Sequence, residues 1–322
     1  MIDQACSIAS KSYPIDPIGT APTSINALLL VELPAPWHRK ITKSPNLNKR
    51  IKEIITRYNK NAIRQVRIQA IRPNNDYSRN GFTRLFYFQK TPSKLEKMDK
   101  LELFLPNGLL NALPELPWDR MTLTDNYARY LESQNKTRDL LICTHEERDY
   151  CCGKFGANLR KILKEKYERI PNRKLRVWET SHLTGHRFAP TILDLPEGRY
   201  WAYINEKTLE TLIRRNGPVS SIPKNHYRGI LGIDSYSQAA EREAFYRNDW
   251  AWIDWKKTAR LIYHENSKAT VLINYESGDK TIKGSYKVNI QLEKTPIRIG
   301  NTRCGKQKDI YGLDITNFQE SS

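Results

Sequence analysis

The chain has 322 residues and a formal net charge of +18, with 27% charged and 39% hydrophobic residues. This composition is typical of a soluble globular protein, long enough for more than one domain. The longest purely apolar run, Ala27 to Val31, is far shorter than the roughly 20 residues that cross a membrane as a helix. Five cysteines are an odd and sparse set, unlike a secreted disulfide framework, and the first residues lack the apolar segment of a signal peptide. We therefore expect a cytoplasmic protein.

Two basic stretches carry almost all of the excess positive charge. Residues 39–72 hold eleven Lys or Arg and one acid, and residues 148–176 hold ten Lys or Arg and three acids. Such a field attracts nucleic acid, anionic lipid or an acidic protein. Solvated helix faces that only keep the protein soluble explain the charge equally well, so charge alone does not choose a partner.

The first half of the chain predicts one α/β unit. A buried strand over Ala27 to Leu33 ends at the turn Pro34 to Pro36. Asn46 can cap a helix whose apolar residues run from Leu47 to Tyr58. Three further strand-like segments follow: Val66 to Ile71, Thr83 to Phe88 and Leu101 to Leu105.

A similar order of elements returns in the second half. A buried strand over Asp139 to Cys143 precedes a helix with apolar residues from Phe155 to Tyr167. Three strands follow: Leu175 to Thr180, Ala189 to Leu195 and Tyr200 to Ile204. Both halves read strand, helix, strand, strand, strand. This indicates two related α/β units over residues 1–130 and 131–216, of which the second carries thiols where the first carries Pro34 to Trp37.

Residues from Glu206 onward differ in character, and we assign residues 217–322 to a separate C-terminal region. A helix over Glu206 to Arg215 ends before the stop signal Asn216-Gly217-Pro218, and Ser237 to Tyr246 predicts another helix. The Trp-rich segment from Trp250 to Trp255 indicates packing rather than a base-stacking platform. Three β-prone runs predict a small antiparallel sheet: Ala259 to Tyr263, Ala269 to Tyr275 and Tyr286 to Leu292. We therefore expect an α/β (α+β) protein with a C-terminal helical and small β region.

Cysteines and histidines gather in two short segments. Cys143, Cys151 and Cys152 lie within ten residues, and His182 and His186 share a loop about thirty residues later. Cys143 ends a strand, Cys152 begins a helix whose N-terminus stabilises a thiolate, and His182 follows the next strand. Because strand ends on one side of an α/β sheet converge, Cys143, one of the adjacent cysteines and both histidines can meet at one point.

Several kinds of site fit these residues. Structural zinc sites favour cysteines closer together than the eight or nine positions found here, and the thiol–disulfide motif C-x-x-C is absent. Two thiolates and two imidazoles can hold a [2Fe–2S] cluster. A zinc-stabilised nucleic-acid-binding or interaction module, and a metal-free thiol reductase that uses Cys151 and Cys152, remain open alternatives. Either adjacent thiolate suits a metal.

Two motifs make the sequence recognisable. C-T-H-x-x-R-D-x-C-C-x-x-x-G from Cys143 and V-W-E-x-S-H-L-x-G-H-R-F-A-P-T from Val177 resemble the sucrase/ferredoxin-like family of thioredoxin-like [2Fe–2S] proteins. The likeness extends to Cys6, the segment LLVELPAPW, the tripeptide YRG at Tyr227 and the pair Cys304-Gly305. The resemblance implies a thioredoxin-like ferredoxin fold with one [2Fe–2S] cluster. The implied ligands are Cys143, Cys152, His182 and His186, with Cys151 as the alternative to Cys152.

The resemblance also sets expectations for function and for the neighbouring residues. We expect a one-electron carrier rather than a stand-alone enzyme, and proton binding at the imidazoles can be coupled to its electron transfer. No Gly-rich nucleotide-binding motif is present, so a self-contained flavin or NAD reductase is not indicated. Its partner would be an acidic redox protein such as a ferredoxin, flavodoxin or reductase, with nucleic acid less favoured. Ser181 and Arg187 would donate hydrogen bonds or charge to the cluster, and His145 would be a polar residue beside it. Cys6 and Cys304 would be buried small residues.

Overall fold

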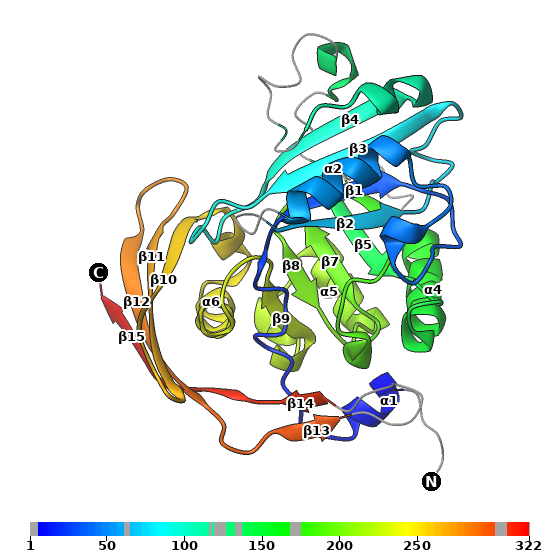
Figure 1. The fold of residues 1–322 in the computed structure, drawn as a ribbon. Helices are drawn as coiled ribbons and strands as arrows, with labels where there is room; N and C mark the ends of the chain where they lie inside the picture. Colours follow the sequence, from blue (N-terminus) through cyan, green and yellow to red (C-terminus); the bar gives the residue numbers. More distant parts are fainter. Residues whose placement is uncertain are drawn as a thin grey trace.

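The computed structural model describes residues 6–60, 65–115, 118, 127–132, 137–167, 175–299 and 308–321. Within these ranges the strands form a mixed sheet of nine strands, a sheet of four and a ribbon of two (Figure 1). The nine strands follow the order β4-β3-β1-β2-β6-β5-β7-β8-β9. The expected mixed α/β fold is confirmed at this level. None of the described helices is long and apolar enough to cross a membrane.

The first half of the chain builds one side of the large sheet. Its elements are β1 (Ile25–Glu32), α2 (Lys49–Lys60), β2 (Gln65–Ile71), β3 (Phe82–Gln89) and β4 (Asp99–Pro106). β1 lies inside the sheet, between β3 and β2. Its last six residues are all buried, as its apolar sequence predicts. It pairs in parallel with β2 and antiparallel with β3, which pairs antiparallel with β4.

The second half repeats this arrangement on the other side. Its elements are β5 (Arg138–Cys143), α4 (Tyr150–Lys166), β6 (Leu175–Thr180), β7 (Ile192–Leu195) and β8 (Arg199–Trp201). β5 is parallel to β6 and antiparallel to β7, which is antiparallel to β8. The strand order and directions therefore match those of the first half. The halves meet where β2 pairs antiparallel with β6, at Ile71 and Thr180, so they share one continuous sheet.

Two predicted strands are shorter in the structure. The segment from Ala189 becomes strand only at Ile192, because Pro190 lacks a backbone donor and a short 3-10 helix precedes it. The segment from Tyr200 ends as strand at Trp201, and Tyr203 has a positive φ of 52°. The prediction also missed α1 (Cys6–Lys11) and β9 (Tyr227–Ile230), which completes the large sheet.

The C-terminal region wraps a second sheet around one helix. Its elements are α5 (Glu206–Arg214), α6 (Ser235–Asn248), β10 (Lys256–Glu265), β11 (Lys268–Glu276), β12 (Lys283–Leu292), β13 (Ile297–Ile299), β14 (Lys308–Ile310) and β15 (Leu313–Ser321). The predicted antiparallel sheet is confirmed and gains a fourth strand, β15. α6 lies between β9 and the concave face of this sheet (Figure 1). Trp252 and Trp255 pack against Tyr275, with ring centroids 5.7 and 5.6 Å away, so the packing interpretation is confirmed.

Short 3-10 helices join these elements. They are η1 (Ile41–Lys43), η2 (Asn107–Ala112), η3 (Ala128–Tyr130), η4 (His186–Phe188), η5 (Val219–Ser221), η6 (Lys224–His226) and η7 (Asp249–Asp254).

The large sheet curls, and its two halves enclose a core between them. Arg176 on β6 pairs with Glu102 on β4 at 2.7 Å, although three strands separate β6 from β4 in the sheet order. Trp178 lies in the same inner core and donates to Asp139 at 2.9 Å. Apolar side chains from both halves fill the remaining space: Leu28, Leu30, Ile71, Phe86, Phe88, Leu141, Leu193 and Tyr200. Both predicted cysteine ligands belong to this inner core, so burial shields them from water.

Candidate metal centre

Cys143 and Cys152 meet where the end of β5 touches the start of α4. Asp149 caps the helix by accepting a hydrogen bond from the backbone N–H of Cys151 at 2.9 Å. Cys152 therefore lies in the first turn. Helix and strand approach so closely that a Cβ on Gly156 would lie 1.9 Å from the carbonyl oxygen of Cys143. Only glycine permits this contact, which brings the two thiols together.

The loop that follows β6 supplies the histidines. Thr184 and Gly185 both adopt left-handed backbone conformations, with φ of 72° and 69°, and the chain then enters η4 at His186. A Cβ on Gly185 would lie 2.6 Å from the guanidinium carbon of Arg228. The turn between the two histidines therefore depends on glycine for both its conformation and its packing.

Hydrogen bonds fix the backbone of His182. Its carbonyl oxygen accepts from Arg67 at 2.8 Å and from Gln69 at 3.1 Å, both on β2. Its N–H donates to Nδ1 of His145 at 3.2 Å, and Nε2 of His145 donates to the carbonyl of Trp37 at 3.1 Å. These two bonds define one neutral tautomer of His145, consistent with a pKa that burial lowers. His145 thus orients His182 from beside the site.

The structure brings three of the four predicted ligands together. The ligand atoms of Cys143, Cys152 and His182 all lie within 4.8 Å of one another, and Sγ of Cys152 is 4.0 Å from Nδ1 of His182. The ring of His186 lies 6.0 Å from that of His182, centroid to centroid. Its Nε2 is turned towards Asp149, whose Oδ2 is 3.6 Å away. His186 is thus a neighbour of the three-residue group but outside it.

Cys151 is directed away from this group. It packs with Cys6 and Ala189 in a separate small cluster, and burial raises the pKa of its thiol. Cys143, Cys151 and Cys152 are free thiols. Cys6 is buried as expected, but it is bonded in a disulfide rather than a free small residue. Cys304 lies outside the described residues.

The two inner thiols titrate as a pair. Burial by itself raises the pKa of Cys143, but hydrogen bonds with Cys152 and His182 outweigh it and hold that pKa well below the usual range. The hydrogen bond to Cys143, followed by burial, raises the pKa of Cys152 well above its usual range. One thiolate therefore forms readily. Burial lowers the pKa of His186 to about 4, although Asp149 opposes the shift, so its imidazole is neutral at pH 7. Thiolate and neutral imidazole are the forms that bind metals.

A model of the sucrase/ferredoxin-like family matches residues 17–229, well over half of the chain. The chain belongs to the sucrase/ferredoxin-like family. No match was found among the curated proteins or among the solved structures. The match spans both halves of the large sheet and contains Cys143, Cys152, His182 and His186, and the family resemblance read from the sequence is confirmed.

A buried arginine from the family segment stands beside the ligand loop. Arg228 is 1% exposed and donates to the carbonyl of Thr20 at 2.7 Å, to its hydroxyl at 3.0 Å and to the carbonyl of Thr184 at 3.3 Å. No carboxylate of the described residues pairs with it. Burial lowers its pKa to about 10, yet the group stays charged at pH 7. A buried cation without a counter-charge is costly, so Arg228 favours negative charge nearby.

Sequence reasoning missed several residues that build the site. Arg67 and Gln69 carried no motif of their own, although Arg67 belongs to the first basic stretch, and Arg228 lay inside the tripeptide YRG. The prediction for Ser181 was wrong. Its hydroxyl donates to Gln69 at 2.8 Å and accepts from the N–H of Ala70 at 3.0 Å, so it ties the loop to β2 instead of donating to a cluster.

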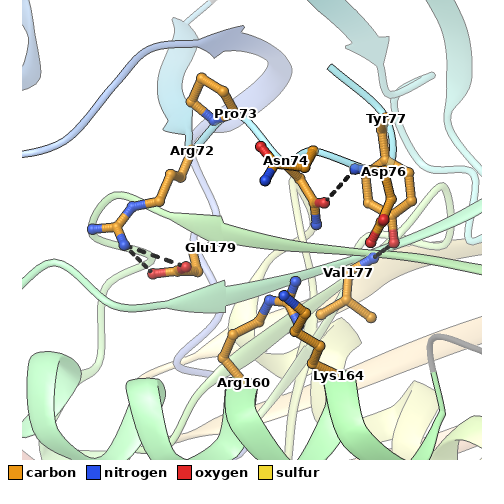
Figure 2. A pocket seen from close by; sticks show the side chains of 10 residues that line it. Arg72, Pro73, Asn74, Asp76, Tyr77, Arg160, Lys164, Val177 and Glu179 are labelled. Carbon is orange, nitrogen blue, oxygen red and sulfur yellow. Dashed lines mark hydrogen bonds and ion pairs between the residues drawn. The ribbon is translucent and has the colours of Figure 1, made fainter. Parts of the chain in front are cut away.

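A hollow in the surface of this family member lies apart from the thiols and histidines. It has a volume of about 490 Å³ and lies between the loop after β2 and the helix α4. Figure 2 shows Arg160 and Lys164 projecting from α4 towards that loop, with Arg72 paired to Glu179 at 3.1 Å on the far side. None of the four predicted ligands lines this hollow. The candidate ligands and this hollow are therefore separate features.

Proposed function

We propose that this protein holds one [2Fe–2S] cluster through Cys143, Cys152, His182 and His186, and acts in one-electron transfer. The observation that carries the proposal is the three-residue group, whose ligand atoms come from the end of β5, the start of α4 and the loop after β6 and lie within 4.8 Å of one another. We further propose that residues 131–216 form a thioredoxin-like ferredoxin unit, and that residues 1–130 form a related unit without ligands. The matching strand orders of the two halves support this proposal.

The residues present fit such a cluster. Two thiolates on one iron and two neutral imidazoles on the other satisfy the ligation of a bis-histidinyl [2Fe–2S] centre. Nε2 of His186 lies 3.6 Å from Oδ2 of Asp149 but makes no hydrogen bond in the described part of the chain, so binding a metal would cost this nitrogen no hydrogen bond. A reduced centre with this ligand set would carry negative charge, and this is the counter-charge that the buried Arg228 lacks among the described residues. A zinc ion suits the same ligands but gains no electron, and so leaves Arg228 unexplained.

When bound, the cluster supplies a site that gains and loses one electron. The chain supplies rigidity and a dry environment. Cys143 and Cys152 are each 1% exposed, so the thiol side of the site excludes water. Arg67, Gln69 and His145 hold the backbone of His182. The His186 side chain is 20% exposed, so the histidine side is the edge where electrons enter and leave.

The histidines also set the potential. Neutral imidazoles in place of thiolates remove negative charge and favour the reduced state, as in Rieske centres at about −150 to +300 mV compared with about −400 mV for all-cysteine ferredoxins. Replacing both His182 and His186 with Cys should therefore lower the midpoint potential, as measured by redox titration. An unchanged or higher potential in the double variant would refute this charge argument.

The proposed function is tested by the metal content of the aerobically purified full-length protein. We expect two irons and two sulfides per chain and visible absorbance, as a [2Fe–2S] cluster requires. The Cys143→Ser variant should lose both, whereas Cys151→Ser should retain them. A colourless protein that contains zinc would assign the ligands to a zinc-stabilised module. Turnover of disulfide substrates that survives loss of both histidines would assign Cys151 and Cys152 to thiol chemistry.

A further inference from the structure

A basic pocket opens beside His182. Its volume is about 310 Å³, and its lining includes the cations Arg39, Lys40, Arg67 and Arg148 together with His145 and His182. We call this feature the His182 pocket. It borders directly on a residue that the proposed function assigns as a ligand, and the inference below rests on that function.

The charge of the His182 pocket is entirely positive. No Asp or Glu lines it. In the part of the chain that the structure describes, none of its four cationic side chains forms an ion pair. Arg39, Lys40 and Arg148 are exposed at its rim, and Arg67 is half-buried. Four uncompensated charges around one opening produce a local field that attracts an acidic group.

Both halves of the chain contribute to the pocket. Arg39 and Lys40 come from the segment before η1, and Arg67 comes from β2, all in the half without ligands. Arg148 comes from the turn before α4. Three of the four cations thus come from the first basic stretch, which the curled sheet brings next to the ligands of the other half. This gives the ligand-free half a role beside the cluster.

The pocket is better suited to a protein surface than to a small anion or nucleic acid. Arg67 and Gln69 already donate to the carbonyl of His182, so the deepest donors are committed. The remaining cations lie on the exposed rim, where charges mainly accelerate encounter with a large partner. No Trp, Tyr or Phe lines the pocket, so it lacks the stacking platforms that single-stranded nucleic acids use.

We propose that the His182 pocket docks the acidic surface of a redox protein and that electrons cross between the two proteins at His182. The reaction moves one electron and no atoms: the partner's redox group is oxidised by one electron while the cluster is reduced by one, or the reverse.

The test measures electron transfer into the iron-loaded full-length protein by anaerobic stopped flow. Fully reduced flavodoxin, an acidic flavoprotein, is one donor, and the methyl viologen radical, a small cation, is the other. The pocket variant is Arg39→Gln, Lys40→Gln and Arg148→Gln. The matched control, Arg260→Gln, Lys268→Gln and Lys287→Gln, removes the same charge from exposed positions of the small sheet.

We expect the pocket variant to react about tenfold more slowly or worse with flavodoxin at low ionic strength, whereas the control variant keeps the unmodified rate within about twofold. The difference should shrink near 0.15 M salt, where the Debye length is about 8 Å. Reduction by methyl viologen should not slow in either variant, because a cation gains nothing from the pocket.

Equal flavodoxin rates in the pocket and control variants would overturn the docking site while leaving the cluster intact. A second contrary result is a duplex oligonucleotide that binds the pocket variant more weakly than the unmodified protein, while flavodoxin reduces both proteins at the same rate. This result would assign the surface to nucleic acid and also overturn the proposal. Failure of methyl viologen to reduce the unmodified protein would instead overturn the proposed function itself.

Discussion

The close contact between α4 and β5 makes Gly156→Ala a sharp test of the site's geometry. The added Cβ would lie 1.9 Å from the carbonyl oxygen of Cys143, whereas real Cβ atoms essentially never approach other atoms within 3.0 Å. The helix must therefore retreat from the strand end by at least the difference, 3.0 − 1.9 = 1.1 Å. Because the obstacle is backbone, no side-chain rotation relieves it. Such overpacking costs about 1–3 kcal/mol, and it separates Cys152 from Cys143.

Urea denaturation of the iron-free protein measures how much Gly156→Ala lowers the free energy of unfolding. Iron analysis after cluster loading shows whether Cys143 and Cys152 are still close enough to bind the metal together. Gly108→Ala is the control, because a Cβ there meets nothing within 4 Å. We expect the control to unfold with a free energy close to that of the unmodified protein and to load fully. The Gly156→Ala variant should lose about 1–3 kcal/mol and most of its iron. A Gly156→Ala protein with unmodified stability and iron content would refute the geometry from which the site is built.

Three further predictions follow from single side chains. Cys152→Ser should abolish iron binding while Cys151→Ser keeps it, because only Cys152 faces Cys143; the reverse pattern in the iron analysis would exchange the two roles. Arg228→Met should lower the midpoint potential by at least about 60 mV, one tenfold step in the reduction equilibrium, because the reduced state loses a buried counter-charge. Arg228→Lys keeps the charge and should shift the midpoint potential less. Equal shifts in the two variants would show that the charge is not the cause. Burial lowers the pKa of His226 to about 4, whereas the pKa of a histidine in the unfolded chain is near 6.5. As the pH falls, the unfolded chain therefore binds the proton before the folded chain does. The stability of the fold should fall as the pH drops from about 6.5 towards 4. In urea titrations of the iron-free protein at several pH values, His226→Gln should reduce this loss by up to about 1.4 kcal/mol per pH unit, less the effect of solvent screening; identical pH slopes would contradict it.

Much of the secondary structure could be predicted from local sequence. Buried strands such as β1 and β5 are continuous apolar runs, and α2 and α4 repeat their apolar residues with helical spacing, so short-range patterns determine them. The pairing of β2 with β6 could not be predicted this way. It depends on contacts between residues more than one hundred positions apart, at Ile71 and Thr180, for which the sequence has no local signal.

The ligand residues were predictable as a set, but their orientations were not. Adjacent residues on a helix point about 100° apart. Cys152 therefore enters the core between the halves while Cys151 enters the small cluster with Cys6. Sequence spacing also placed His186 with the thiols, whereas in the structure its Nε2 faces Asp149. The direction of the His186 side chain depends on the left-handed turn at Thr184 and Gly185 and on the packing of that turn against Arg228. Both features exist only in the folded chain.

Pulsed EPR of the dithionite-reduced protein labelled with ¹⁵N-histidine measures whether both thiolates and both imidazoles bind one iron–sulfur cluster. We expect a spin-½ signal with ¹⁵N couplings from two histidine ligands, and these couplings should disappear when His182 and His186 are both replaced with Cys. A reduced protein without an EPR signal, or a signal without nitrogen coupling, would contradict the proposed ligation.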